Sequence, residues 1–430
     1  MIKDYSRIPT EINTFFKDDY GKTLLIKGAP GSGKTVFALT LLSTLEGNGI
    51  YLSTRVDADT LYMQHPWIKD EISPDNIVDA TQPEGERTTA LKQVTIKPLK
   101  HSNVPEFLKS VYSRTEKMQN PIIIIDSWEA IAFYSGYYEQ RDKEGLEHNL
   151  CDVARRTKTK IILLVEYLGQ TALDYLVDGV VTVESDMYED RRLRWMRMQK
   201  LRGCQITNPV RLFSLNKGIF KCFVEFRGVD AAIENPTIPD PIPDFSDTRL
   251  STGIKDLDRI TGGYGNFNLF EGDHVTYNVL AHAFSINALN LGRALMFASV
   301  MHTDYINNIT ALVKQEYRDN VTIIEDIKDH VDTIKEKERS TVFINLEEVG
   351  DIDRTVRELM ALIRVQGCNV MCFVGKKGYG ELDSFASTHL KTKFISGVPC
   401  VYGEHPRTEI YAMEFDTSES MYQIKLIPIV

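Results

Sequence analysis

The glycine-rich run at residues 28–35, Gly-Ala-Pro-Gly-Ser-Gly-Lys-Thr, constrains the fold more than any other part of the chain. Such a loop wraps a phosphate with its backbone N–H groups, and its glycines supply φ values that side chains disfavour. The apolar segment Thr23–Lys27 precedes the loop, and apolar residues recur at helical spacing through residues 36–45. A strand, a glycine loop and a helix in this order predict a nucleoside triphosphate site on a parallel α/β sheet.

Two side chains of the loop have specific expected roles. Lys34 is expected to reach the β- and γ-phosphates of ATP, and the Thr35 hydroxyl is expected to hold Mg²⁺. The remaining loop residues are expected to enclose the phosphates with their backbone: Gly28, Ala29, Pro30, Gly31, Ser32 and Gly33. Four consecutive isoleucines predict a buried strand that ends at Asp126. A carboxylate at that end of a parallel strand lies beside the phosphate loop, so Asp126 and Thr35 are the expected metal pair.

Length and composition limit the class of protein. A chain of 430 residues predicts two domains, because one hydrophobic core rarely serves so long a chain. The net charge of −10 argues against a broad nucleic-acid surface. Apolar runs are shorter than the roughly 18 residues of a membrane span, and the N-terminus has no apolar signal core. Six scattered cysteines favour reduced thiols, so we expect a cytoplasmic protein without a membrane partner.

A proline-rich stretch marks the clearest boundary. Four prolines lie between Asn235 and Asp244, and they predict an extended linker because proline cannot donate to a helix or a sheet ladder. We therefore expect domains at residues 1–234 and 248–430, joined by a linker at 235–247. Apolar strands alternate with amphipathic stretches in both halves, which predicts two α/β units with parallel sheets in tandem.

The expected strands follow this plan. In the first half they are Leu24–Lys27, Gly49–Ser53, Ile122–Asp126, Ile161–Glu166 and Gly179–Val183, with an antiparallel pair formed by Val180–Glu184 and Leu193–Lys200. In the second half they are Leu269–Gly272, Ala294–Ser299, Thr341–Leu346 and Asn369–Gly375, with a terminal hairpin of Ile410–Phe415 and Tyr422–Val430. The second half thus repeats the order of the first.

A general base for attack by water is harder to identify. Glu129, three residues after Asp126, and Glu166, at the end of the next strand, are the candidates, with Asp57 and Asp59 as further ones. Carboxylates at such positions are more often solvated loop residues. The sequence therefore supports nucleotide binding better than fast hydrolysis, and at most a slow ATPase.

Residues 191–202 are the strongest local charge feature. As a regular strand, one face would carry Arg194, Met196, Met198, Lys200 and Arg202, and the other Leu193, Trp195 and Leu201. Three interpretations stay open. The segment is a partly buried strand, or a subunit interface at which Lys200 or Arg202 reaches a neighbour's γ-phosphate, or a contact for nucleic acid or an acidic protein.

These motifs together resemble the RecA/KaiC group of P-loop ATPases, which form rings or filaments with nucleotide at subunit interfaces. The resemblance rests on the glycine loop, on Ile122–Asp126 followed by Ser127, on Tyr175–Val181, and on Lys200-Leu-Arg-Gly203. It implies RecA/KaiC-like domains, a homo-oligomer, and Lys200 and Arg202 presented to a neighbouring subunit's phosphates.

The second half resembles the same group but departs from it at the site. Residues 251–258, Ser-Thr-Gly-Ile-Lys-Asp-Leu-Asp, are similar to the motif that precedes the glycine loop in KaiC-like domains. The expected loop then reads His274-Val-Thr-Tyr-Asn-Val279, which lacks glycine, and Tyr277 would obstruct a phosphate. The strand expected to carry the metal-binding aspartate ends at Asn345. We expect a degenerate site, and a domain that serves as structure, interface or partner surface.

The first half also departs from KaiC-like ATPases. These carry a Glu-Glu pair after the second strand, where this chain has Arg55-Val56, and the opening Ile8–Lys17 lacks the KaiC-like motif that precedes the loop. The chain is more similar to the archaeal gas vesicle protein D (GvpD) group, regulators with one P-loop and arginine-rich segments, to which Arg191–Arg197 corresponds. This resemblance implies an archaeal ATP-binding regulator with slow or no hydrolysis.

Two function classes follow. The first is a regulatory protein that uses Mg²⁺ and ATP to control a protein partner, such as a transcription regulator. The alternative is an active RecA/KaiC-type ring ATPase that acts on DNA, which the acidic balance disfavours, or that phosphorylates itself, for which no acceptor Ser or Thr can be singled out.

Overall fold

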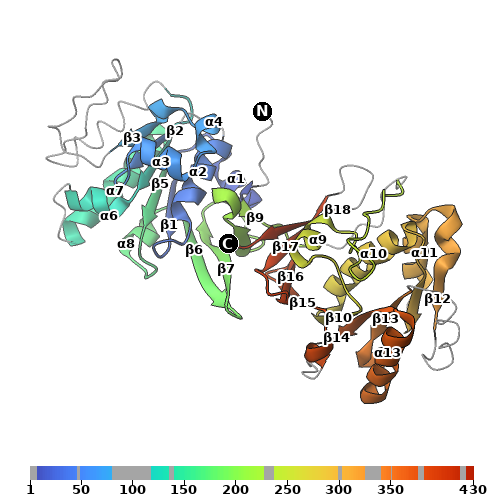
Figure 1. Ribbon diagram of the computed structural model, residues 1–430. Helices are drawn as coiled ribbons and strands as arrows, with labels where there is room; N and C mark the ends of the chain where they lie inside the picture. Colours follow the sequence, from blue (N-terminus) through green and yellow to red (C-terminus); the bar gives the residue numbers. More distant parts are fainter. Residues whose placement is uncertain are drawn as a thin grey trace. The chain divides into compact units, whose positions relative to one another are not determined.

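The computed structural model describes residues 7–45, 49–79, 118–134, 140–226, 237–298, 303–324, 340–349, 351–375, 382–416 and 423–430. The chain divides into two compact units, Met1–Phe223 with Ile429–Val430, and Val224–Pro428 (Figure 1). The division precedes the proline-rich stretch, whose described residues 237–244 belong to the second unit. The last two residues of the sequence belong to the first unit, which no sequence pattern indicated.

The first unit contains a sheet with the strand order β3-β2-β4-β5-β1-β6-β7-β8-β9. Its parallel strands are β3 (Ile77–Asp79), β2 (Gly49–Ser53), β4 (Ile122–Asp126), β5 (Lys160–Val165), β1 (Thr23–Lys27) and β6 (Gly179–Tyr188). The antiparallel strands that extend it are β7 (Arg191–Leu201), β8 (Val210–Ser214) and β9 (Lys221–Cys222).

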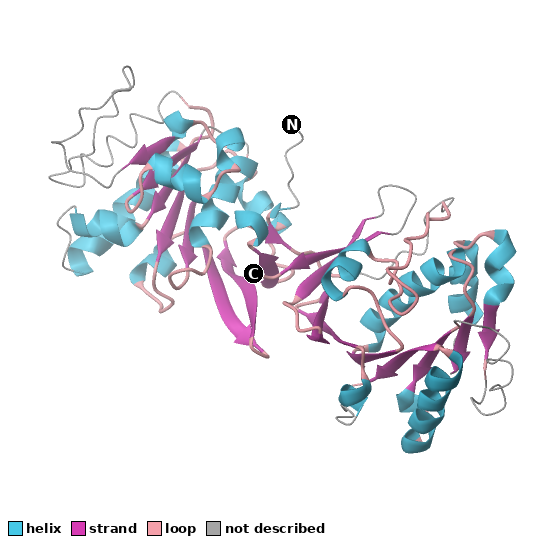
Figure 2. Ribbon diagram, viewed as in Figure 1, coloured by secondary structure: helices cyan, strands magenta, loops and turns pink. Residues whose placement is uncertain are grey.

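Helices cover both faces of this sheet, as Figure 2 shows. One face packs against α1 (Thr10–Phe16), α2 (Lys34–Thr44), α3 (Ala58–Gln64) and α4 (Ile68–Glu71). The other face packs against α6 (Trp128–Tyr134), α7 (Gln140–Thr157) and α8 (Ala172–Leu176). Two 3₁₀ turns, Pro74–Asn76 and Asn216–Gly218, complete the unit's described helical segments.

The isoleucine strand β4 explains why the sheet is covered on both sides. Successive side chains of a strand point to opposite faces, so Ile122 and Ile124 enter one hydrophobic core while Ile123 and Ile125 enter the other. Fully burying each such side chain contributes about 1.5–3 kcal/mol. The strand therefore belongs at the centre of the sheet, where its end places Asp126 between neighbouring strand ends.

The second unit repeats this plan position by position, in the order β12-β11-β13-β14-β10-β15-β16-β17-β18. Its parallel strands are β12 (Val321–Ile323), β11 (Leu295–Ala298), β13 (Thr341–Asn345), β14 (Asn369–Val374), β10 (Phe267–Gly272) and β15 (Thr388–Ile395). Its antiparallel strands are β16 (Val398–His405), β17 (Tyr411–Asp416) and β18 (Gln423–Pro428).

The helices of the second unit also lie on two faces. They are α9 (Lys255–Thr261), α10 (His274–Asn290), α11 (Thr303–Ala311) and α13 (Ile352–Gln366), with 3₁₀ segments Gln315–Asn320, Leu346–Glu348 and Leu382–Phe385. The matching strand order and directions confirm the predicted α/β class with two similar, mostly parallel sheets in tandem. The predicted strands agree with the observed ones to within a few residues, although β3, β8, β9, β12, β15 and β16 were not anticipated as strands.

The predicted alternation along the basic strand β7 is wrong at its end. Val180 pairs with Lys200 but Val181 pairs with Met198, so Gln199 is an extra, bulged residue. A bulge reverses the facing of the residues that follow it. Leu201 therefore packs in the same core as Met198, while Lys200 faces α8 on the opposite side of the sheet.

Two further properties follow from the described residues. None of the helices they form is long and apolar enough to cross a membrane. All six cysteines lie within these residues and none forms a disulfide.

Candidate nucleotide site

The glycine loop connects β1 to α2 over six residues, from Gly28 to Gly33. Gly31 and Gly33 have φ values of 75° and 107°, which favour glycine. Gly28 is required for space, because a Cβ there would lie 2.4 Å from the carbonyl oxygen of Val183. The sequence thus folds as predicted for this motif, with α2 beginning at Lys34 directly after the loop.

Lys34 is held inside the loop. Its side chain is buried, and Nζ donates to the carbonyl oxygens of Gly28 at 2.8 Å and Ala29 at 2.9 Å. Burial lowers the pKa of the Lys34 ammonium, although the carboxylates of Glu166 and Asp126 act in the opposite direction. The ammonium is therefore bound by loop carbonyl oxygens and lies within the electrostatic influence of these two carboxylates.

Thr35 and Asp126 meet at the same edge of the sheet. The Thr35 hydroxyl donates to Asp126 Oδ2 at 2.7 Å, and the Tyr51 hydroxyl donates to the same oxygen at 2.5 Å. A hydroxyl beside a carboxylate is the protein donor set that P-loop proteins use for Mg²⁺. The residues present fit this ion: Thr35 and Asp126 would hold it, and the ion would neutralise charge on the phosphates.

Tyr51 was missed by sequence reasoning. It lies within the apolar strand β2 and is buried, and burial together with the Asp126 carboxylate raises its pKa well above the usual value. The phenol is therefore a neutral, permanent donor that orients Asp126. The local sequence signal for this role was weak: Tyr51 carries a hydroxyl in an otherwise apolar strand, and that strand pairs with the strand of Asp126.

We expect Tyr51→Phe to weaken Mg²⁺-dependent ATP binding by about tenfold, because groups that orient a metal ligand typically contribute this much to metal affinity. Nucleotide binding measured with EDTA in place of Mg²⁺ should change little. Titration calorimetry in the two conditions would measure both values. Tyr62→Phe is the matched control, since the Tyr62 hydroxyl donates to the Ile72 carbonyl oxygen in the same unit. Equal losses with and without Mg²⁺ would contradict a role in orienting the metal ligand.

The two candidate bases, Glu166 and Glu129, lie near Thr35 and Asp126, but both already accept hydrogen bonds from other groups. Glu166, directly after β5, accepts a hydrogen bond from Arg55 Nη1 at 2.5 Å, and this contact lowers the pKa of Glu166 below its usual value. Glu129, in the first turn of α6, accepts from the backbone N–H of Glu166 at 2.9 Å through Oε1. Its Oε2 is buried and has no hydrogen-bond partner among the residues that the structure describes. Asp57 instead caps α3, where it accepts from the Thr60 N–H.

Lys200 and Arg202 lie away from the glycine loop of their own chain. Lys200 donates to three carbonyl oxygens at the end of α8 and beyond, those of Asp174, Tyr175 and Val177. Arg202 is half exposed and pairs at 3.3 Å with Asp178, which binds Thr23 at the start of β1. Since the loop follows the opposite end of β1, four residues or roughly 13 Å further along the strand, neither cation reaches it within one subunit.

Arg194, on the basic strand, is the arginine that contacts the loop. It is almost fully buried, and Nη1 donates to the carbonyl oxygens of Ser32 at 3.0 Å and Gly31 at 3.3 Å. Its Nε donates to the carbonyl oxygen of Val430 at 2.6 Å. Burial, with a smaller effect from Arg192, lowers the pKa of Arg194 to about 10. The sequence singled out this segment but not this residue.

The corresponding connection of the second unit has a different construction. A single residue, Asp273, separates β10 from α10, and its side chain caps the helix by accepting from the Thr276 N–H at 2.8 Å. Residues 274–279, expected as a loop, therefore form the first turns of α10. Tyr277, expected to obstruct a phosphate, is buried and stacks on Phe373 with ring centroids 4.6 Å apart.

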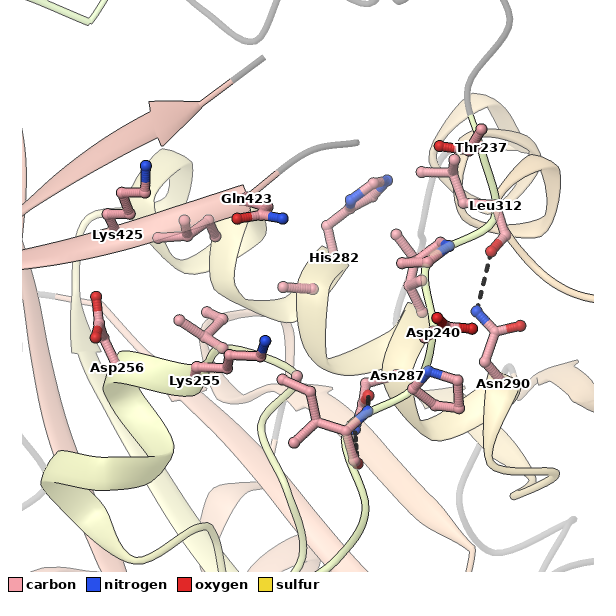
Figure 3. Close-up of a pocket in the computed structure, with 18 residues that line it drawn as sticks. Thr237, Asp240, Lys255, Asp256, His282, Asn287, Asn290, Leu312, Gln423 and Lys425 are labelled. Carbon is pink, nitrogen blue, oxygen red and sulfur yellow. Dashed lines mark hydrogen bonds between the residues drawn. The ribbon is translucent and has the colours of Figure 1, made fainter. Parts of the chain in front are cut away.

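The second unit also contains a pocket of about 420 Å³. Figure 3 shows Lys255 and Asp256 of α9 and Lys425 of β18 on one side, and His282 and Asn287 of α10 on the other. Burial lowers the pKa of His282 to about 4, so its imidazole is neutral near pH 7. The lining carries charges of both signs, and its walls at Thr237 and Gln423 continue into residues outside the described ones, so we assign it no ligand.

Comparison with known proteins agrees with the site. Residues 12–202 match the family described as "GvpD gas vesicle protein, P-loop domain". This segment is therefore similar to the GvpD P-loop domain family. The match begins in α1 and ends just after β7, so the GvpD P-loop domain includes the glycine loop, Tyr51, Asp126 and Arg194.

Two curated relatives come from Halobacterium salinarum. Protein GvpD1 is 34% identical over 274 residues, which cover 61% of this chain and 50% of the relative. Protein GvpD2 is 32% identical over 266 residues, which cover 60% of this chain and 53% of the relative. The chain thus spans about half the length of the curated relatives it matches, and the resemblance to GvpD proteins predicted from the sequence is confirmed.

Proposed function

We propose that this protein is a regulatory switch that binds Mg²⁺ and ATP in its GvpD P-loop domain and hydrolyses ATP slowly or not at all. The main support for this proposal is that Lys34, Thr35 and Asp126 meet at one edge of the sheet. The candidate base beside them, Glu166, is already ion-paired with Arg55. Binding requires only the first three groups, whereas turnover also requires a base free to accept a proton.

The state of Glu166 supports slow hydrolysis. A general base works best when its pKa lies near the operating pH, and the Arg55 contact moves the pKa of Glu166 further below that range. Glu129 has one carboxylate oxygen committed to a backbone N–H and the other buried. An ATP-dependent change of conformation, rather than rapid turnover, suits such a site.

We propose one nucleotide per chain, with the second unit as a structural or partner-binding part. Its one-residue connection leaves no loop to wrap a phosphate, and Asn345 replaces the aspartate at the end of β13. We also propose a cytoplasmic homo-oligomer that acts on a regulatory protein partner. The family's description as a gas vesicle protein supports an output tied to gas vesicles.

The test is to measure ATP binding and ATP hydrolysis side by side, at two protein concentrations and with and without DNA. We expect one bound nucleotide per chain and little turnover under every condition. Two nucleotides per chain would refute the single site. Turnover that rises with protein concentration would instead favour a ring ATPase in which Lys200 and Arg202 act across subunits, and stimulation by DNA would favour the recombinase-like alternative.

A further inference from the structure

Arg55 occupies a particular place at the nucleotide site. Ser53, the last residue of β2, pairs with Asp126, and the Thr54 N–H donates to the Asp126 carbonyl oxygen at 2.8 Å. Arg55 therefore follows directly after the residues that lock β2 to the end of the aspartate strand. Its charge interacts with those of Lys34, Asp126 and Glu129, as well as with its ion-pair partner Glu166.

The Arg55–Glu166 pair differs from the rest of the site in its exposure. The Arg55 side chain is 51% exposed and that of Glu166 is 31% exposed, whereas Lys34 is buried and bound to loop carbonyls. Ion pairs on the surface contribute little to stability, so this pair can open at small cost. Arg55 is thus a cation beside the metal pair that can change partner without disturbing the fold.

The sheet order indicates which phosphate Arg55 faces. The strands lie in the order β2-β4-β5-β1, so Arg55 follows the strand beside that of Asp126, and two strands separate it from the strand that leads into the loop. In P-loop proteins the metal-binding aspartate and the attacking water lie at the γ-phosphate end of the nucleotide. A planar guanidinium suits this position because it binds phosphate oxygens in pairs.

We propose that Arg55 is the sensor that distinguishes a nucleoside triphosphate from a diphosphate. With a triphosphate bound, Arg55 leaves Glu166 and donates to γ-phosphate oxygens; with a diphosphate bound, it stays on Glu166. The proposal rests on the nucleotide site proposed above and adds the means by which that site recognises its ligand. No covalent step is involved, since the guanidinium exchanges one anionic partner for another.

The partner exchange also gives the switch an output. Glu166 begins the segment that joins β5 to α8. Lys27 ties this segment to the start of the loop through the Gly169 carbonyl oxygen at 2.5 Å, and it ties α8 there through Asp174 at 2.7 Å. Release of Glu166 removes one of the contacts that hold the segment, on which Leu168 is 51% exposed. The segment can therefore present a different surface in the two nucleotide states.

The experiment compares the affinities for a non-hydrolysable ATP analogue and for ADP, each with Mg²⁺, by titration calorimetry on the full chain. For Arg55→Ala we expect at least about a tenfold loss of affinity for the ATP analogue, equivalent to about 1.4 kcal/mol, and less than about a twofold loss for ADP. Arg55→Lys should fall between wild type and alanine, because an ammonium keeps the charge but not the paired donors. Arg156→Ala, an equal change of charge on the exposed end of α7, is the control and should alter neither affinity.

A second variant tests the partner exchange itself. Glu166→Gln removes the anion that competes for Arg55, so the ratio of triphosphate to diphosphate affinity should rise severalfold. In the Arg55→Ala background the same change should leave that ratio unaltered. Equal losses for both nucleotides in Arg55→Ala, or an unchanged ratio, would overturn the sensor role while leaving the nucleotide site intact. If the wild-type chain bound neither nucleotide, the proposed function itself would fail.

Discussion

Lys34→Ala is expected to lower the affinity for ATP by at least about 100-fold. Lys34 Nζ lies inside the glycine loop, where it donates to two loop carbonyl oxygens and would donate to the β- and γ-phosphates. Hydrogen bonds to charged groups contribute about 1.5–3 kcal/mol each, and two such bonds correspond to a factor of roughly 100 or more in affinity. Calorimetry or displacement of a fluorescent ATP analogue would measure the loss.

We do not expect this loss to come from unfolding, because burial disfavours the charged ammonium in the folded protein. Burial lowers the pKa of Lys34, which means that the charged form is destabilised in the folded protein relative to water. The melting temperature of Lys34→Ala should therefore match that of wild type or exceed it slightly. Lys69→Ala, which removes the same charge from the exposed surface of α4, is the control. Unchanged ATP affinity in Lys34→Ala would refute the assignment of the loop.

The sequence was sufficient to predict the parts of the site that depend on local chemistry. A glycine loop between an apolar strand and a largely buried helix has few structural solutions, and four isoleucines before Asp126 require a central strand. Parallel strands bring their C-terminal ends to one edge, so the meeting of Thr35 and Asp126 over 91 residues of sequence could be anticipated. The tandem repeat of the α/β plan was predictable for the same reason.

What the sequence did not predict depends on contacts between distant strands. The Tyr51 hydroxyl reaches Asp126 only because β2 lies beside β4, and Arg55 meets Glu166 only because both strand ends reach the same edge. The bulge at Gln199 depends on how β6 and β7 pair rather than on any residue type that favours a bulge. The sequence did contain a local signal for the start of a helix at His274, because Asp273 is a residue type preferred as an N-cap. This signal was missed because residues 274–279 were matched to the glycine loop of the first half and expected to form a loop.

Arg194 combines two of these unpredicted features, since it is a buried charge and a contact between distant segments. Its pKa is lowered to about 10 mainly by burial, and its described hydrogen bonds go to carbonyl oxygens, with two of them in the glycine loop. A buried guanidinium is costly to desolvate and is not expected to stabilise the fold strongly. Its contacts to Gly31 and Ser32 instead point to a positioning role, in which it fixes the loop so that backbone N–H groups face the phosphates.

Arg194→Met is therefore expected to lower the affinities for ATP and ADP together, by about tenfold each, with a melting temperature within a few degrees of wild type. Losing one charge-assisted hydrogen bond costs about 1.5–3 kcal/mol. In the free energy of folding, this cost is offset because the variant no longer buries a charge. In the free energy of nucleotide binding, nothing offsets it. Arg194→Lys should recover only part of the affinity, because an ammonium lacks the planar donors that bind several carbonyls at once. Calorimetry with both nucleotides distinguishes this pattern from that of Arg55→Ala, which is expected to affect the triphosphate alone.

Arg192→Met, on the exposed face of the same strand, should change neither affinity. If Arg194→Met lowered the melting temperature strongly and bound nucleotide normally, Arg194 would be a structural residue with no role in positioning the loop.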